Sequence, residues 1–367
     1  SAIAEFEDSA NQMVIEAGLL YGANSQEQES VRKAWAEVGI VTSALESTGN
    51  QRKEESGGSL DIDPAQGDSV MTYLRSQDGT TSDNSGEDYG VYLYTINQPY
   101  EGFLEGENIG PVNDSPAGYI RPSIATREDG STLIAYIGKD GIARLTLPNT
   151  EDNKIEGGAA NQVRSIALSR DGLKYAFVPE NSATIWVYDF TSQEWTDYEI
   201  MEPNYSEDEP GTRVQLVDSI SFDPHGKAIL FDYLVCRVVP AESCVDLWSI
   251  GEVNLNTKVI DFPFLTLDPL LDLAYPQYSK VGYSAITFDL VDYSDFESEG
   301  TVQSFVVVLS SNVTPIVSPN QGDTRLFAYG IPSFIGADKA VLFQVLNDDQ
   351  STLYQAEIDD EYQLISD

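Results

Sequence analysis

Apart from its carboxylates, this sequence contains few side chains that could carry out chemistry. The 367 residues include one histidine, His225, and two cysteines, against sixty aspartates and glutamates. His225 stands in the sequence DPHG, which is typical of a turn, so we interpret it as an exposed turn residue rather than as a base or a metal ligand. The sequence has no Gly-Xaa-Ser-Xaa-Gly motif, and a Ser-His-Asp triad would have to recruit this turn histidine. We therefore predict no catalytic residues.

The carboxylates leave one catalytic alternative open. Glycosidases need only two acids at a set separation, and sixty acids make such pairs inevitable by chance. The Ser-Xaa-Asp-Xaa-Gly-Xaa-Thr-Trp turn of sialidases is missing from the sequence, and no pair of acids stands out as a site. A carboxylate-dependent hydrolase acting on glycans remains the alternative function.

Calcium is the candidate ion. The loop 78–88 has the sequence DGTTSDNSGED, and its oxygen ligands suit a hard cation, although their spacing does not match an EF-hand. The candidate ligands are Asp78, Asp83, Asn84, Glu87 and Asp88. The same composition is typical of a long solvated hairpin loop, which is the competing interpretation. We predict no other cofactor.

Aromatic residues in long insertions are the candidate binding residues. The largest insertions between predicted strands are 97–118, 201–213 and 291–300. They carry Tyr100, Phe103, Tyr205, Tyr293 and Phe296 among acidic residues. Exposed aromatic rings can stack on sugars or peptides, whereas rings that pack against their own loop serve only the fold.

The two cysteines are informative about the cellular compartment in which the protein works. Cys236 and Cys244 bound the segment CRVVPAESC, in which Pro240 suggests the tip of a hairpin between two apolar strands. A hairpin could bring the two sulfur atoms together, so we predict a disulfide, with two unrelated buried thiols as the alternative. A disulfide would place the protein in the periplasm or outside the cell.

The charge excludes several classes of partner. Sixty acidic and twenty basic residues give a formal net charge of −40, with the acids spread along the whole chain. Such a surface repels nucleic acid and anionic lipid, and it favours solubility in a salty medium such as a marine or halophilic bacterial habitat. No apolar stretch approaches the length of a membrane span.

Two regions differ in pattern. Residues 1–57 lack hairpins. Ser25 and Gln28 could form a capping box ahead of apolar residues at helical spacing, so we predict a helical N-terminal segment that ends in a linker. From residue 58 to residue 367, short apolar strands come in groups that start near 59, 119, 164, 217, 272 and 329.

A repeated hairpin marks the second region. In its clearest copies, 126–137, 169–178 and 223–231, a strand leads to a turn with aspartate one to three residues before glycine, and a second strand follows. Repetition of one hairpin predicts small stacked sheets, each unable to bury its own faces. The fold class is therefore all-β, a six-bladed β-propeller. Seven blades is the alternative, since the N-terminal segment could add a strand to the ring.

The units SRDGLKYAFV at 169–178 and FDPHGKAILF at 222–231 resemble the SPDG repeat of TolB-like, WD40-related β-propellers. The resemblance covers residues 58–367 and implies a propeller scaffold. The repeat occurs in periplasmic binding proteins, in oligopeptidase propellers and in cell-surface proteins, so it says little about activity. We predict an exported, non-catalytic binding or scaffold protein that presents loops to a protein, peptide or glycan.

The net charge generates a first prediction. Carboxylates on a compact body repel one another, and dissolved ions shorten the range of that repulsion to about 3 Å at 1 M salt. We expect the melting temperature to rise with sodium chloride, as followed by circular dichroism. A flat profile up to about 1 M salt would show that the acids are already paired or widely separated.

Overall fold

The computed structural model describes most of the chain beyond Leu60 and, before it, only Ser30, which is helical. The described residues are 30, 60–65, 68–76, 89–96, 106–109, 117, 121–147, 153–154, 162–201, 212–238, 244–264, 270–280, 285–293, 303–310, 313–317, 328–335, 338–347 and 350–363. Apart from Ser30, the predicted N-terminal helix and its linker lie outside them. Within these residues, no helix has the length and apolar character needed to cross a bilayer.

The described residues form antiparallel sheets, which we number 1 to 6 in chain order. Sheet 1 contains β1 (Leu60–Ala65), β2 (Asp68–Ser76), β3 (Tyr89–Ile96) and β4 (Gly106–Ile109). Sheet 2 contains β5 (Ser123–Thr126), β6 (Thr132–Ile137), β7 (Ala143–Thr146) and β8 (Asn153–Lys154). Sheet 3 contains β9 (Val163–Leu168), β10 (Lys174–Pro179), β11 (Thr184–Asp189) and β12 (Glu194–Glu199).

The second half of the chain continues the series. Sheet 4 contains β13 (Thr212–Phe222), β14 (Ala228–Val238), β15 (Cys244–Asn254) and β16 (Ile260–Phe264). Sheet 5 contains β17 (Leu271–Tyr278), β18 (Ile286–Asp292), β19 (Gln303–Leu309) and β20 (Val313–Val317). Sheet 6 contains β21 (Ala328–Ile335), β22 (Ala340–Asn347) and β23 (Gln350–Glu357). These sheets begin within five residues of the starts predicted for the strand groups.

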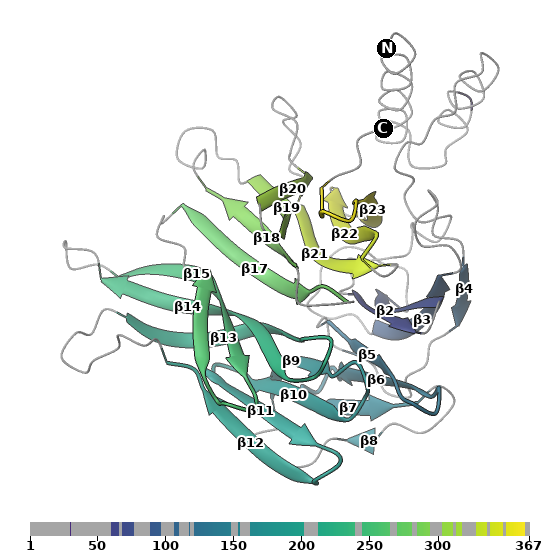
Figure 1. Ribbon diagram of the computed structural model, residues 1–367, viewed down its shortest axis with the longest axis horizontal. Coiled ribbons are helices and arrows are strands. Elements are labelled where there is room, and N and C mark those ends of the chain that lie inside the picture. Colours follow the sequence, from purple (N-terminus) through teal and green to yellow (C-terminus); the bar gives the residue numbers. More distant parts are fainter. Residues whose placement is uncertain are drawn as a thin grey trace.

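The first strands of the sheets lie next to one another in chain order. β1 contacts β5, β5 contacts β9, and the series continues through β13 and β17 to β21, which in turn contacts β1. Later strands of each sheet lie progressively further from the centre (Figure 1). The fold is therefore all-β and propeller-like, as the sequence predicted.

The apolar core lies between the faces of neighbouring sheets. In β10, Tyr175 and Phe177 pack with residues of sheet 2, whereas Ala176 and Val178 pack with residues of sheet 4. Successive side chains of a strand point to opposite faces, so an unbroken apolar run buries both sides of a sheet. A strand with apolar and β-branched residues on both of its faces thus requires a neighbouring sheet on each side.

The Asp-Gly turns have the local structure that their residue types predict. Gly130, Gly172 and Gly226 have φ angles of 79°, 64° and 62°, where a side chain would be strained. In the third turn the N–H of Gly226 donates to the Asp223 carbonyl at 3.0 Å, and the Asp223 carboxylate accepts the His225 N–H at 2.9 Å. The aspartate supplies an acceptor and the glycine a positive φ.

A second prediction concerns Gly251, which lies directly across β14 and β15 from Phe231. A Cβ atom at position 251 would lie 2.5 Å from Cζ of Phe231, whose ring is fully buried. We expect Gly251→Ala to lower the free energy of unfolding by about 1–3 kcal/mol, because the ring must leave its place in the core.

Urea unfolding of the two single variants and the double variant would measure this coupling. Phe231→Leu destabilises by itself, but it frees space beside position 251. The double variant should therefore lose less stability than the sum of the two single losses. Additive losses would contradict a clash between Phe231 and the new methyl group.

Candidate functional site

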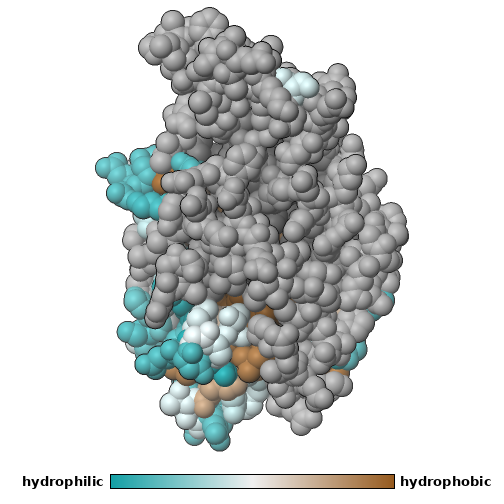
Figure 2. All heavy atoms as spheres, turned by 90° about the vertical axis from the view of Figure 1, so that its right-hand side faces the viewer, coloured by the Kyte–Doolittle hydropathy of each residue, from teal (hydrophilic) through white to brown (hydrophobic). Residues whose placement is uncertain are grey.

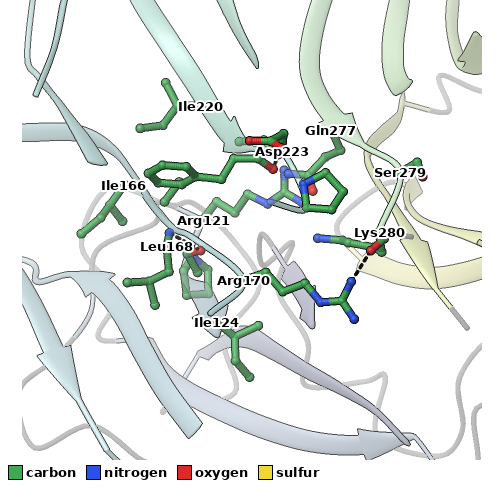
Figure 3. A pocket seen from close by; sticks show the side chains of 16 residues that line it. Arg121, Ile124, Ile166, Leu168, Arg170, Ile220, Asp223, Gln277, Ser279 and Lys280 are labelled. Atoms are coloured by element: carbon green, nitrogen blue, oxygen red, sulfur yellow. Dashed lines mark hydrogen bonds between the residues drawn. The ribbon is translucent and has the colours of Figure 1, made fainter. Parts of the chain in front are cut away.

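A small pocket lies at the centre of the ring, where the first strands of sheets 2, 3, 4 and 5 come together (Figure 3). Its walls are residues 121–124, 166–168 with Arg170, 220–224, and Gln277, Ser279 and Lys280. The cavity volume is about 40 Å³. One water molecule needs about 10–15 Å³ on this measure, so the pocket has room for a group of only a few heavy atoms.

Three basic side chains line this pocket: Arg121, Arg170 and Lys280. Arg170 extends from sheet 3 towards sheet 5, where its Nη1 donates to the Lys280 carbonyl at 2.6 Å (Figure 3). Arg121, just before β5, extends towards Gln277 of β17 (Figure 3). With the Gln277 amide oxygen facing the guanidinium, Nη2 of Arg121 donates to it at 2.8 Å, and Nη1 donates to the same oxygen. Both arginines thus bridge sheets that are not neighbours in the chain.

Among the residues described as lining the pocket, Asp223 is the one carboxylate. It is fully buried, and its Oδ1 accepts the backbone N–H groups of Lys227 and Ala228. Next to the pocket, Asp338 accepts the Ser279 hydroxyl at 2.6 Å and the Lys280 N–H at 2.7 Å. These acids hold turns and strand ends in place, and they do not form the opposed pair that a glycosidase needs.

Two further acids are buried between sheets. Asp232 of β14 accepts the N–H of Ser219 at 2.5 Å and that of Tyr275 at 2.8 Å. Asp289 of β18 accepts the N–H of Ile331 at 3.0 Å through Oδ2, while its Oδ1 has no hydrogen-bond partner among the described residues. The register of the first strand shifts at each of these places. Each acid thus holds a β-bulge in the first strand of the next sheet.

The bulge residues explain why a carboxylate is needed there. Tyr275 and Ile331 have φ angles of 52° and 54°, which are unfavourable for residues other than glycine. Their N–H groups point away from the ladder and would be unsatisfied without an acceptor. The buried aspartate satisfies them, at the cost of placing a carboxyl group in the core.

Burial shifts the pKa values of these acids upward. It raises the pKa of Asp232 to about 8, with a further contribution from the neighbouring Asp218 carboxylate. Burial also raises the pKa of Asp289 well above its usual range, although the Ile331 N–H and the Arg121 charge oppose this shift. Asp218 itself pairs with Arg164 at 2.6 Å. The raised pKa values favour the neutral form of both buried carboxyl groups.

The outcome for His225 agrees with the sequence. It is exposed in the turn that joins β13 to β14, and its backbone N–H donates to the carboxylate of Asp223. The interpretation of this residue as a turn residue is confirmed.

Of the predicted binding aromatics, Tyr293 is the one within the described residues. It follows β18 and is half-buried, with its hydroxyl bonded to the carboxylate of Asp272 of β17. Burial raises the pKa of Tyr293, and the Asp272 charge adds to that shift. This contact ties the ring to its own sheet. Tyr100, Phe103, Tyr205 and Phe296 lie outside the described residues, as do the calcium candidates Asp78, Asp83, Asn84, Glu87 and Asp88.

The two cysteines lie on the predicted hairpin. Cys236 belongs to β14 and Cys244 begins β15. The register pairs Cys236 with Asp246 and Cys244 with Val238, so the two positions are diagonal neighbours in the backbone ladder of the hairpin. The disulfide stays a prediction.

Sequence reasoning missed the pocket cations. Arg121, Arg170 and Lys280 are single residues at strand ends, far apart in a chain with twenty basic residues. A usable signal was their position: each stands within two residues of the start or end of a first strand. Because first strands surround the axis of a ring, side chains at their ends converge there.

Comparison with known proteins gives only distant likenesses. No protein-family model matches the sequence, and no curated protein matches it. The hydrazine synthase of Kuenenia stuttgartiensis is a structural neighbour with a TM-score of 0.46 and 11% identity, over 82% of this chain and 78% of that one. TolB from Acinetobacter baumannii has a TM-score of 0.45 and 14% identity, over 91% of this chain and 70% of that one.

A third prediction follows from the buried acids. A carboxyl group whose pKa is raised in the folded protein stabilises the fold below its unfolded pKa of about 3.9, and that stability is lost as pH rises through the folded pKa. For Asp232 the folded pKa is about 8. We therefore expect the free energy of unfolding to fall between about pH 4 and pH 8, as measured by urea unfolding.

The variant Asp289→Asn isolates the contribution of Asp289 to this pH dependence of stability. Its amide oxygen can still accept the Ile331 N–H, and the side chain is neutral at every pH. The slope of stability against pH should become shallower than in the wild type, by up to about 1.4 kcal/mol per pH unit. If the curves of stability against pH are parallel for the variant and the wild type, that result would contradict a raised pKa of Asp289. Asp232→Asn is the contrasting variant, because both oxygens of Asp232 accept N–H groups, and it should destabilise at every pH by about 1–3 kcal/mol.

Proposed function

We propose that residues 58–367 form a six-bladed β-propeller of the TolB-like, SPDG-repeat type. The succession of first strands from β1 to β21 and back to β1 supports this proposal. So do the Asp-Gly turns, which occupy the same place between the first and second strands of sheets 2, 3 and 4.

The turn after the third strand of sheet 6 is similar to turns in other sheets. After the third strand of sheets 3 and 4, a turn ends in a residue of positive φ, Gln193 or Lys258. A shorter turn of this kind follows β23, where Tyr362 has a φ of 61° and the Asp359 N–H donates to the Gln363 carbonyl at 2.9 Å. This similarity supports a repeated blade-like unit.

We further propose that the protein is an exported, non-catalytic binding or scaffold protein, which engages a protein, peptide or glycan through the face of the ring that bears the pocket. One observation carries this proposal: the pocket at the axis presents cations and hydroxyl groups around a single engaged carboxylate. Such a lining supplies contacts rather than an acid and a base. Export rests on the predicted disulfide between Cys236 and Cys244, and calcium at loop 78–88 rests on the sequence.

The carboxylate-dependent hydrolase is the weaker candidate. It requires two acids that flank an open site, whereas the described lining of the pocket holds Asp223 alone, with its oxygens occupied by backbone donors. The buried acids Asp232 and Asp289 also hold backbone N–H groups.

Peptide and glycan arrays would test the proposal. Leu173 and His225 are exposed in the first-to-second-strand turns on the pocket side. We expect Leu173→Glu and His225→Glu to weaken binding of an array ligand about tenfold or more, since each places a charge in the interface. Lys139→Glu is the control: it is an exposed residue between β6 and β7, at the opposite end of sheet 2.

Two results would contradict this function. One is array binding that survives both pocket-side variants. The other is turnover of aryl-glycosides or peptides that disappears when one carboxylate is substituted, which would favour the hydrolase.

A further inference from the structure

We propose that the central pocket is a binding site for a small oxyanion, a carboxylate or phosphate-type group, held by Arg170 and Lys280 with hydroxyl groups of the first strands. This inference rests on the proposed binding function and names the chemistry that the pocket recognises. The group could be a free anion or an anionic end of a larger partner.

The local sign of charge is the first argument. Acids outnumber basic residues by three to one in the chain, sixty against twenty. Around the pocket the ratio is reversed, with three basic side chains and one carboxylate among the lining residues. A formal net charge of −40 repels anions from the chain as a whole, so a concave site with local positive charge is favourable for anion binding.

The second argument is the rigidity of the cations. The bond from Arg170 to the Lys280 carbonyl joins sheets 3 and 5, and it fixes the guanidinium beside the pocket. On the other side of Lys280, its N–H is held by Asp338, which is itself buried. The held Arg170 guanidinium can therefore bind an anion at a smaller cost in side-chain entropy, and the bonds to Lys280 fix the backbone from which its ammonium group extends.

The hydroxyl groups complete the polar wall. Ser123, Ser221 and Ser279 line the pocket from sheets 2, 4 and 5, and all three are buried. The Ser123 hydroxyl accepts the Leu168 N–H at 3.0 Å and can still donate to an anion, and the Ser221 hydroxyl makes only a long 3.4 Å bond to the Phe222 carbonyl. The Ser279 hydroxyl donates to Asp338 and contributes polarity to the wall. Arginine and lysine next to serine hydroxyls form a donor set typical of sites for carboxylate and phosphate groups.

The nearby acids do not cancel this positive charge. Asp223 and Asp338 direct their oxygens to the Asp223 turn and to the end of β17, and their two formal charges still leave the three cations of the lining in excess. Asp289, which faces Arg121, is buried, and its raised pKa favours the neutral carboxyl group.

The volume limits the ligand. A cavity of about 40 Å³ admits a carboxylate or a tetrahedral oxyanion, but not a sugar ring or a peptide side chain with its backbone. A larger partner would therefore insert one charged group and contact the surrounding turns with the rest of its surface.

Isothermal titration calorimetry with the full chain would test the site. The probes are inorganic phosphate, sulfate, and an N-acetylated glycine tripeptide with either a free or an amidated carboxyl end. Sodium chloride keeps the ionic strength constant, because salt alone is expected to change stability. We expect saturable binding of at least one anionic probe and none of the amidated peptide.

Three single variants localise the site. Arg170→Gln and Lys280→Gln should each weaken binding about tenfold or more, because each removes a charged donor. Lys139→Gln removes the same charge from the opposite end of sheet 2 and should leave binding within about twofold. Lys280→Gln keeps the backbone carbonyl that Arg170 binds, so a folded protein with lost binding is expected even if Arg170→Gln unfolds.

The outcomes distinguish the two sources of the anion, and they also distinguish the oxyanion site from the proposed binding function. Binding of phosphate or sulfate alone supports a free anion, and binding of the free-acid peptide supports an anionic end of a partner. If no probe saturates, or if Lys139→Gln weakens binding as much as Lys280→Gln, the oxyanion site is wrong. If array ligands in that case still respond to Leu173→Glu, the proposed function stands without it.

Discussion

Sheets 3 and 4 each have two apolar faces, and that constraint determines the rest of the structure. A strand such as β10 alternates residues of two different cores, with Phe177 facing sheet 2 and Val178 facing sheet 4. A single sheet of this composition cannot be stable in water, and a stack of them would leave two end faces exposed. Closing the series so that β1 meets β21 removes both ends. The pocket lies in the centre that the first strands of this closed series of sheets surround.

The distribution of charge follows from the same geometry. Most of the sixty acids can be solvated at strand ends and loops, whereas the axis is narrow and walled by backbone. Groups at the axis need partners. Arg121 and Gln277 pair across the centre, and Asp338 of sheet 6 accepts the Lys280 N–H from the neighbouring sheet 5. The result is a polar interior layer whose members come from sheets that are far apart in the sequence.

Local features were accessible from the sequence, and long-range ones were not. The turns at Gly130, Gly172 and Gly226 and the starts of the sheets were predicted, because turn chemistry and strand periodicity depend on neighbouring residues. Asp232 and Asp289 could not be recognised as buried, since an acid in an alternating strand normally faces solvent. Their burial depends on bulges in the next sheet, at Tyr275 and Ile331. The pocket was missed for the same reason: the side chains of Arg170 and Lys280 meet only after closure.

The bond between Arg121 and Gln277 affects how the ring can come apart. Sheets 2 and 5 lie three positions apart in the series, so this contact links opposite sides of the ring. Separating two neighbouring sheets would break the packing between them and would also strain the bond between Arg121 and Gln277, which makes partial opening of the ring costly. The first strands should then behave as one cooperative unit in hydrogen exchange, with the outer strands opening earlier. That arrangement keeps the centre of the ring closed even while the outer strands open.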